Sequence, residues 1–429
     1  MNHTHKLEGA RAVCVGFLQR TTTRGARLDQ LASFRPFLSL SAQDRRLATE
    51  MAYGVIRNKG RLDFYIRELS GRELRKIDPV IRWVLRLGLY ELEFLRTPDR
   101  AAVYEAVELT RVVRKASAAS FVNAVLRGYL RNRPELPSGS SAAALAVRFS
   151  HPEWLVARYL DRFGEDATCG LLERNNSNPL PLVRVNRFKT DIPVFTRLLE
   201  QEGIAYEEFA SLPDALVIHH PAFAQHPFYQ DGYCFFMDAA SQEVAHLPDL
   251  EGVRTIGDFC AAPGGKAFIL AWRCRGKLYL KCLDISRARL LQMRKRAEVQ
   301  GVPGLSYLLA DLTRPAPFQA VFDFVLADVP CSGLGTIRSN PDIRWTIQSS
   351  HLSRFQERQV SILRNAFDAL APGGRVFYVT CSTEPEENEQ VVERFLESEP
   401  RSVLAHPYFR TFPGAHPGDC FFAAEIRHI

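Results

Sequence analysis

Apolar residues recur at helical intervals through the first third of the chain, roughly residues 8–133. Charged residues fill the positions between them, which is the pattern of helices that bury one face. Two stripes are clearest: Ile81, Val84, Leu85, Leu89, Leu92 and Leu95, then Phe121, Val122, Val125, Leu126, Tyr129 and Leu130. Such stripes most often form a core, so they predict an all-α domain over residues 1–137.

The pattern changes after this region. Residues 134–141 are rich in proline, serine and glycine and lack periodicity, which is typical of a linker. Residues 145–235 combine a helix start at His151-Pro152 with a short apolar run at 182–186. This middle part is expected to form a small α/β subdomain.

From residue 236 to residue 429, apolar runs of strand length alternate with helical stretches. The predicted strands are 254–258, 278–284, 305–310, 322–328 and 375–380. Nearly continuous apolar strands that alternate with helices predict a parallel sheet covered on both faces. Ligands in such folds bind beyond the carboxyl ends of the strands.

The charge is unevenly distributed along the chain. Residues 1–150 contain 26 Lys and Arg against 14 Asp and Glu, whereas the remaining 279 residues contain 29 against 34. A basic front half favours a polyanionic partner, although a solvated arginine-rich surface would have the same composition. Nucleic acid is the expected partner.

The cysteine pattern and the hydropathy limit the classes of protein to which this chain can belong. Nine scattered cysteines favour a reducing cytoplasm over a disulfide framework. No CxxC or zinc-like His/Cys spacing occurs, so no metal site is expected. No apolar run reaches the ~18 residues of a membrane span, and no secretory signal is recognised.

A glycine-rich loop joins the first of these strands to a predicted helix. Its residues are Cys260, Ala261, Ala262, Pro263, Gly264, Gly265 and Lys266. The loop matches neither GxGxxG nor GxxxxGK[ST], so a dehydrogenase or a triphosphate site is disfavoured. Asp284, Asp311 and Asp328 close the next three strands. Each Asp alone could be a helix cap or turn former, but three at successive strand ends predict a ligand site.

Two cysteines also lie at predicted strand ends, Cys331 in Pro330-Cys331-Ser332 and Cys381 in Thr380-Cys381-Ser382. With the glycine-rich loop, this set resembles the RNA cytosine-5 methyltransferases of the Nol/Nop/Sun family. The resemblance implies a Rossmann-like catalytic domain that binds S-adenosylmethionine. In the family, residues 260–266 contact the methionine end, Asp284 the ribose, Asp311 the adenine and Asp328 the region of the methyl group.

The resemblance also assigns roles to the two cysteines. Cytosine C5 becomes nucleophilic when a thiolate adds to C6, and a partly ionised thiol is needed for this step. Cys381 is implied as the nucleophile and Cys331 as the residue that assists product release, while Asp328 could also hold the cytosine edge. DNA cytosine-5 methyltransferases use only the Pro-Cys cysteine, so the presence of both favours RNA. The other free cysteines are interpreted as buried small hydrophobes.

The front half adds a second resemblance. Met51-Ala52-Tyr53-Gly54-Val55-Ile56-Arg57 and Phe121-Val122-Asn123-Ala124-Val125-Leu126-Arg127 resemble the helical NusB-type RNA-binding domain. The whole chain is therefore similar to bacterial 16S rRNA cytosine-5 methyltransferases of the Sun/Fmu/RsmB type. This similarity implies a cytoplasmic enzyme, expected to be monomeric, that modifies 16S rRNA. A tRNA methyltransferase and a non-catalytic ribosome-assembly factor are the alternatives.

This chain departs from the family pattern at a few positions. Ala267 follows the loop lysine where threonine is common, and Ala310 precedes Asp311 where glycine is common. Cys420 replaces a usual glycine near the carboxyl end. None of these changes removes an expected liganding side chain.

Overall fold

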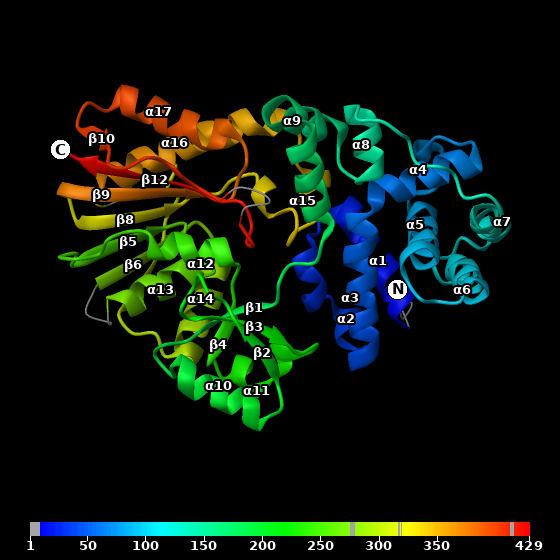
Figure 1. The fold of residues 1–429 in the computed structure, drawn as a ribbon, viewed down its shortest axis with the longest axis horizontal. Helices are drawn as coiled ribbons and strands as arrows, with labels where there is room; N and C mark the ends of the chain where they lie inside the picture. Colours follow the sequence, from blue (N-terminus) through cyan, green and yellow to red (C-terminus); the bar gives the residue numbers. More distant parts are fainter. Residues whose placement is uncertain (1–8, 275–278, 316–317, 319, 412–415) are drawn as a thin grey trace, which may run out of the picture. The chain divides into compact units, whose positions relative to one another are not determined.

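A computed structural model describes residues 9–274, 279–315, 318, 320–411 and 416–429 (Figure 1). The chain forms two compact units. Unit 1 runs to Ser177 and also includes Asn340–Thr346, which we call the insert; unit 2 comprises Asn178–Ser339 and Ile347–Ile429. The middle segment predicted at 145–235 is thus divided between the units, and the domain boundaries stay a prediction.

Unit 1 is helical, as predicted. Helix α5 (Pro79–Phe94) begins at a cap that the sequence supplies: the Asp78 carboxylate accepts a hydrogen bond from the Val80 amide at 2.9 Å, and Pro79 takes the first helical position. The helices of its described residues are α1 (Ala10–Arg24), α2 (Arg35–Leu38), α3 (Ala42–Arg57), α4 (Lys59–Ser70), α5 (Pro79–Phe94), α6 (Asp99–Val112), α7 (Ala119–Arg131), α8 (Ala142–Arg148), α9 (Glu153–Asn176) and α15 (Ile343–Thr346), with 3-10 turns at Leu28–Ser33, Leu74–Lys76 and Ala116–Ala118.

The insert places a buried cation inside unit 1. Arg344 is fully buried and donates hydrogen bonds to the carbonyl oxygens of Ser150 (3.0 Å) and Asn175 (3.0 Å) and to Asn176 Oδ1 (2.7 Å). These acceptors are neutral. Burial, with a smaller contribution from the charge of Arg57, lowers the pKa of Arg344 to about 9.

The residues beside Arg344 hold the insert in the same way. The Trp345 indole donates to the Ile56 carbonyl at 2.8 Å, and the Lys59 ammonium lies 4.5 Å from the centre of the indole ring. Asp342 accepts a hydrogen bond from the Leu28 amide at 3.3 Å. The insert is therefore part of the core of unit 1 although most of its sequence neighbours belong to unit 2.

Unit 2 contains two sheets. The smaller is antiparallel with strand order β2-β3-β1-β4. One side packs against a helix whose start is capped by Asp191, which accepts from the Val194 amide at 2.9 Å. The elements here are β1 (Leu182–Val185), α10 (Ile192–Gln201), β2 (Ala205–Glu208), β3 (Ala215–His219), a 3-10 turn at Phe223–Gln225, α11 (Pro227–Gln230) and β4 (Cys234–Phe236).

The larger sheet has the order β10-β12-β9-β8-β5-β6-β7, with β11 paired to β12. Strands β5 to β9 run parallel and correspond to the predicted strands, whereas β10, β11 and β12 add an antiparallel edge that was not predicted. Its strands are β5 (Thr255–Phe259), β6 (Tyr279–Asp284), β7 (Leu305–Leu309), β8 (Phe322–Asp328), β9 (Leu370–Thr380), β10 (Ser402–Leu404), β11 (Phe409–Arg410) and β12 (Phe422–His428).

Helices cover both faces of this sheet, as predicted (Figure 1). Along β8, Val325 and Ala327 pack with residues of α16 and α17, whereas Phe324 and Leu326 pack with α12, α13 and α14. This alternation follows from the period of two in a strand. The remaining elements are α12 (Ala239–His246), α13 (Gly265–Arg273), α14 (Arg287–Gln300), α16 (Leu352–Asp368) and α17 (Glu389–Ser398), with 3-10 turns at Leu334–Thr336, Ser349–His351 and Pro385–Glu387.

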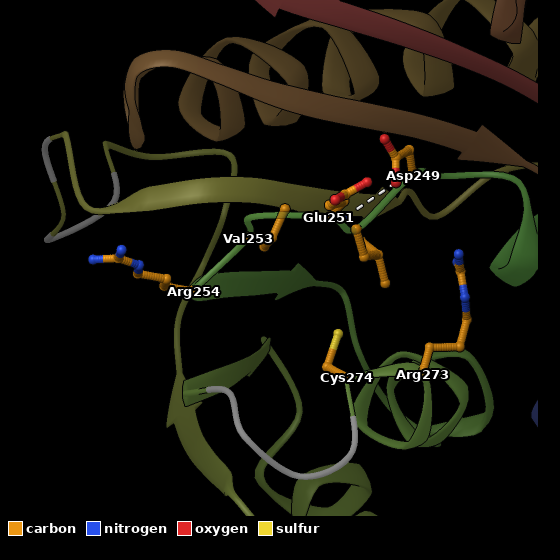
Figure 2. A pocket seen from close by; sticks show the side chains of 7 residues that line it. Asp249, Glu251, Val253, Arg254, Arg273 and Cys274 are labelled. Atoms are coloured by element: carbon orange, nitrogen blue, oxygen red, sulfur yellow. Dashed lines mark hydrogen bonds between the residues drawn. The ribbon is translucent and has the colours of Figure 1, made fainter.

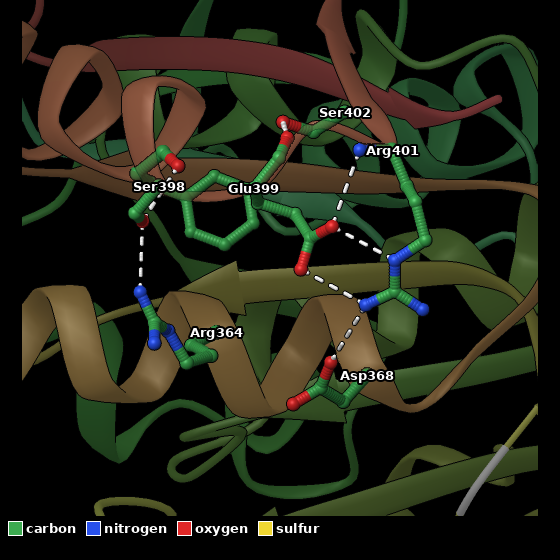
Figure 3. A network of polar contacts seen from close by, with 7 residues as sticks. Arg364, Asp368, Ser398, Glu399, Arg401 and Ser402 are labelled. Carbon is green, nitrogen blue, oxygen red and sulfur yellow. Dashed lines mark hydrogen bonds and ion pairs between the residues drawn. The ribbon is translucent and has the colours of Figure 1, made fainter.

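A polar network joins the ends of α16 and α17 (Figure 3). Arg401 Nε and Nη2 donate to the two carboxylate oxygens of Glu399 at 2.8 and 2.9 Å, and Asp368 lies 3.6 Å from Nη2. Arg364 donates to Ser398 Oγ at 2.8 Å. The hydrogen bonds from Arg401 lower the pKa of Glu399 to about 2.

This network predicts a small acid-dependent contribution to stability. Because the folded pKa of Glu399 lies below its ordinary value, the contribution is present above about pH 4.5 and is lost as pH falls toward 2. Because Arg401 is largely exposed, water and salt screen its attraction to Glu399. Glu399→Gln should therefore lower the thermal midpoint of unfolding by only about 1–2 °C at pH 7. Differential scanning calorimetry at pH 7 and pH 3 checks this, with exposed Glu397→Gln as the control. A shift that stays constant across this range would contradict the assignment.

The described residues contain neither a candidate membrane span nor a candidate metal cluster. None of their helices is long and apolar enough to cross a membrane. In the same residues, no group of three or more His, Cys, Asp or Glu side chains has an arrangement that could hold a metal ion.

Candidate functional site

The predicted site residues lie at one edge of the large sheet. The loop of residues 260–266 follows β5, Asp284 ends β6, and Asp328 ends β8. Asp311 lies just after β7, while Cys331 and Cys381 follow β8 and β9. Because these strands are parallel neighbours, their carboxyl ends meet at the same edge.

A pocket of about 440 Å³ lies elsewhere in unit 2 (Figure 2). It borders the amino end of β5 and the carboxyl end of α13, so it is at the opposite end of the strands from the predicted residues. Its lining residues are Asp249, Leu250, Glu251, Val253, Arg254, Arg273 and Cys274. None of them belongs to the predicted site.

The glycine-rich loop needs a backbone that only glycine adopts easily. Gly264 has φ +101°, and a Cβ there would lie 2.7 Å from the Phe268 ring. The Gly264 amide donates to the Ala261 carbonyl at 2.8 Å, which closes the turn before α13 begins at Gly265. The loop therefore brings bare backbone and a helix start to the sheet edge, as an anionic or polar ligand requires.

Asp284 is buried and already holds the loop. Its carboxylate accepts from the Ser286 amide at 2.8 Å and from the Ala262 amide at 3.3 Å. Arg289 lies 3.3 Å away and also donates to the Ala262 carbonyl. A role in binding ribose hydroxyls stays a prediction for this residue.

Asp311 is more exposed and forms a local turn. Its Oδ1 accepts from the Thr313 hydroxyl at 2.7 Å and from the Thr313 amide at 3.1 Å. These hydrogen bonds lower the pKa of Asp311, with Arg314 at 3.6 Å adding to the effect. Asp311 therefore does act as a turn former, which was the alternative to a ligand-binding role. Its contact with adenine stays a prediction.

Lys266 and Asp328 form an ion pair of 2.7 Å beside the cysteines. Burial lowers the pKa of Lys266, but the Asp328 carboxylate outweighs this effect, so the net pKa is raised. The Lys266 ammonium also interacts electrostatically with Cys381 and lies 5.0 Å from the centre of the Phe421 ring. The pair supplies a fixed cation where a thiolate would form.

Cys331 and Cys381 face each other with 3.2 Å between their sulfur atoms. The strands that carry them are joined by the hydrogen bond from the Val329 amide to the Val379 carbonyl at 3.1 Å. The hydrogen bond with Cys381, followed by burial, raises the pKa of Cys331 well above its ordinary value. Cys331 is therefore held as a thiol at neutral pH.

Glu387 was not predicted from the sequence as a site residue. The side chain is fully buried, and its carboxylate accepts hydrogen bonds from Ser332, Ser382 and Gln359. Burial raises its pKa against the effect of these bonds. In the sequence Glu387 lies between the polar residues Glu386 and Asn388, so no local signal distinguishes it.

Asp258 was also left without a role. It lies inside β5, is 1% exposed, and has no hydrogen-bond partner for either carboxylate oxygen within the described part of the chain. Burial, with the charge of Asp328, raises the pKa of Asp258 well above its ordinary value. An acidic residue inside an otherwise apolar strand, just before the loop, was the sequence signal.

Solved structures share this fold. The protein PH0851 matches 98% of this chain and all of its own length, with a TM-score of 0.84 and 23% identity. A methyltransferase homologue from Pyrococcus horikoshii matches 68% of this chain and 100% of its own, with a TM-score of 0.60 and 24% identity. At these identities the likeness concerns the fold alone.

Sequence profiles and curated relatives agree over most of the chain. The profile of the 16S rRNA methyltransferase RsmB/F matches residues 247–427, the NusB family 9–131, and the RsmF/B-like ferredoxin-like domain 151–224. The probable ribosomal RNA small subunit methyltransferase B of Bacillus subtilis is 33% identical over 84% of this chain and 82% of its own. The ribosomal RNA small subunit methyltransferase B of Cronobacter sakazakii is 31% identical over 90% of this chain and 91% of its own length. By this identity and coverage, the chain belongs to the RsmB/F family of small-subunit rRNA methyltransferases.

Proposed function

We propose that this rRNA methyltransferase transfers a methyl group from S-adenosylmethionine to C5 of a cytosine in 16S rRNA, through a covalent bond between Cys381 and C6. The observation that carries the proposal is the 3.2 Å contact between Cys331 and Cys381, at the ends of adjacent strands. The Lys266–Asp328 ion pair lies beside them. A pair of thiols next to a fixed cation suits the formation and later removal of a cysteine adduct.

The residues at the sheet edge fit S-adenosylmethionine. Its ammonium group would meet the unpartnered carboxyl group of Asp258, which is a residue to add to those predicted from sequence. The loop of residues 260–266, Asp284 and Asp311 would hold the methionine, ribose and adenine parts. When bound, S-adenosylmethionine supplies an electrophilic methyl group on a sulfonium.

The cysteines divide the work on the base. The Cys381 thiolate adds to C6 of cytosine, and the electron pair of the C5–C6 double bond becomes available at C5 to take up the methyl group. A water molecule then takes the C5 proton, the electron pair of that C–H bond re-forms the C5–C6 double bond, and the bond between sulfur and C6 breaks to release the Cys381 thiolate. Cys331, held as a thiol beside the adduct sulfur, assists this release.

Lys266 and Asp328 stabilise the charges that this sequence creates. Asp328 can accept a hydrogen bond from the cytosine amino group, while Lys266 favours the thiolate of Cys381. Both side chains are fixed by their mutual contact before substrate arrives, so little reorganisation is needed.

Unit 1 supports RNA as the substrate. Its match to the NusB family and the basic balance of residues 1–150 favour phosphate contacts that do not depend on sequence. The target cytosine must leave its stack to reach the thiols, so a loop or partly unfolded rRNA is favoured over a regular helix.

A methyl-transfer assay tests the proposal. Purified protein with radiolabelled S-adenosylmethionine is offered 16S rRNA, 23S rRNA and bulk tRNA from cells that lack this enzyme, and nucleosides are analysed. We expect 5-methylcytidine in 16S rRNA only. Label in tRNA alone would overturn the target, another methylated nucleoside would overturn the chemistry, and no label from protein that binds the cofactor would favour an assembly factor.

A further inference from the structure

We propose that Glu387 is a positioning residue that ties the two cysteine loops together and sets the separation of their sulfur atoms. This inference rests on the proposed function, because it assigns a role in the same reaction. Glu387 touches neither sulfur; it acts through Ser332 and Ser382, the residues that directly follow Cys331 and Cys381.

The contacts of Glu387 involve both loops at once. Oε1 accepts from the Ser332 amide at 2.7 Å and from Gln359 Nε2 at 3.1 Å. Oε2 accepts from the Ser382 hydroxyl at 2.5 Å and from the Ser332 hydroxyl. The two serine hydroxyl oxygens are 3.2 Å apart. One carboxylate is thus the common acceptor for the chain segments that follow β8 and β9.

Only an ionised carboxylate satisfies this set of donors. Four donors converge on two oxygen atoms, which matches the roughly four lone-pair positions of a carboxylate. A glutamine in the same place would direct an NH₂ group at part of this set, and the serine hydroxyls would have to turn away. Hydrogen bonds to a charged acceptor are also about twice as strong as neutral ones.

Glu387 is itself held by rigid elements. Its carbonyl oxygen accepts a hydrogen bond from the Tyr378 hydroxyl of β9 at 2.6 Å, and Gln359 belongs to α16. Gln359 also donates to the Pro330 carbonyl at 3.1 Å, next to Cys331. A change at Glu387 should therefore loosen the cysteine loops while the strands keep their positions. The charge of Glu387 also adds to the raised pKa of Cys331, which favours the thiol at that position.

The kinetic test compares Glu387→Gln with Glu393→Gln, an exposed glutamate on α17. For Glu387→Gln we expect kcat to fall about 100-fold, because a displacement near 1 Å has that effect, while KM for rRNA and the Kd of S-adenosylmethionine change less than about twofold. Glu393→Gln should match the wild type. Adding Ser332→Ala and Ser382→Ala to Glu387→Gln should cause little further loss, because the same bonds are removed. Additive losses, or a change in KM alone, would overturn the proposal.

A second measurement does not depend on catalysis. Diamide oxidises a pair of thiols to a disulfide by removing two electrons and two protons. Mass spectrometry then measures the rate at which the Cys331–Cys381 disulfide forms. We expect this rate to fall at least about tenfold in Glu387→Gln and in the double variant Ser332→Ala, Ser382→Ala. Equal rates in all variants would overturn the positioning role even if cytosine methylation is confirmed. Slower crosslinking with no 5-methylcytidine from the wild type would instead retain the role and overturn the proposed reaction.

Discussion

Replacing Cys381 by alanine is expected to abolish methyl transfer, with a loss of at least about 1000-fold in kcat, and to abolish the covalent complex with RNA. The reason is that the Lys266 ammonium interacts electrostatically with Cys381, while the raised pKa of Cys331 favours its thiol form. Steady-state methylation of 16S rRNA and denaturing gels of protein mixed with RNA measure the two effects.

The partner cysteine should behave in the opposite way on the gel. In Cys331→Ala the adduct forms but fails to resolve, so a band of protein joined to RNA should accumulate while turnover falls. Cys274→Ala is the matched control, since Cys274 lines the pocket at the far end of the strands. Methylation by Cys381→Ala would contradict its role as the nucleophile. Accumulation of the complex in Cys381→Ala and not in Cys331→Ala would show that the roles are reversed.

Arg344→Met should destabilise unit 1 by about 3 kcal/mol, because several buried acceptors lose their donor at once. The carbonyl groups of Ser150 and Asn175 and the side chain of Asn176 all depend on the Arg344 guanidinium. Native-state hydrogen exchange at the amides of α3, α8 and α9 measures the loss within unit 1.

The control for this variant is Arg131→Met, which removes an exposed arginine at the end of α7. Arg131→Met should change the free energy of opening, as measured by hydrogen exchange, by less than about 0.5 kcal/mol. If Arg344→Met left the exchange rates of unit 1 unchanged, the buried hydrogen bonds of the insert would not stabilise that unit.

Local patterns were enough to predict much of the fold. The predicted strand 322–328 coincides with β8, and the helical stripes before residue 133 form the core of unit 1. The strand ends then gave the shared edge of the candidate site, because parallel strands align their carboxyl ends. The edge strands β10 to β12 were missed because two of them are very short and lack a clear alternation.

Contacts between distant parts of the sequence could not be predicted in the same way. Glu387 and Ser332 are 55 positions apart, and nothing local indicates that a carboxylate joins two cysteine loops. Asp258 could have been noted as an acid in an apolar strand, but its lack of partners is a property of the folded chain. The membership of residues 340–346 in unit 1 likewise depends on long-range hydrogen bonds that no local pattern indicates.

The insert has a consequence for synthesis on the ribosome. Unit 1 cannot be completed when Ser177 emerges, because Arg344 and Trp345 are still unsynthesised. At a translation rate of ~5–20 residues per second, roughly 10–30 s pass between the synthesis of Ser177 and that of Trp345. During this time the acceptors of Arg344 are open to solvent or chaperones. Cotranslational folding of unit 1 is thus coupled to translation through most of unit 2, and a fragment that ends at Ser177 should fold incompletely.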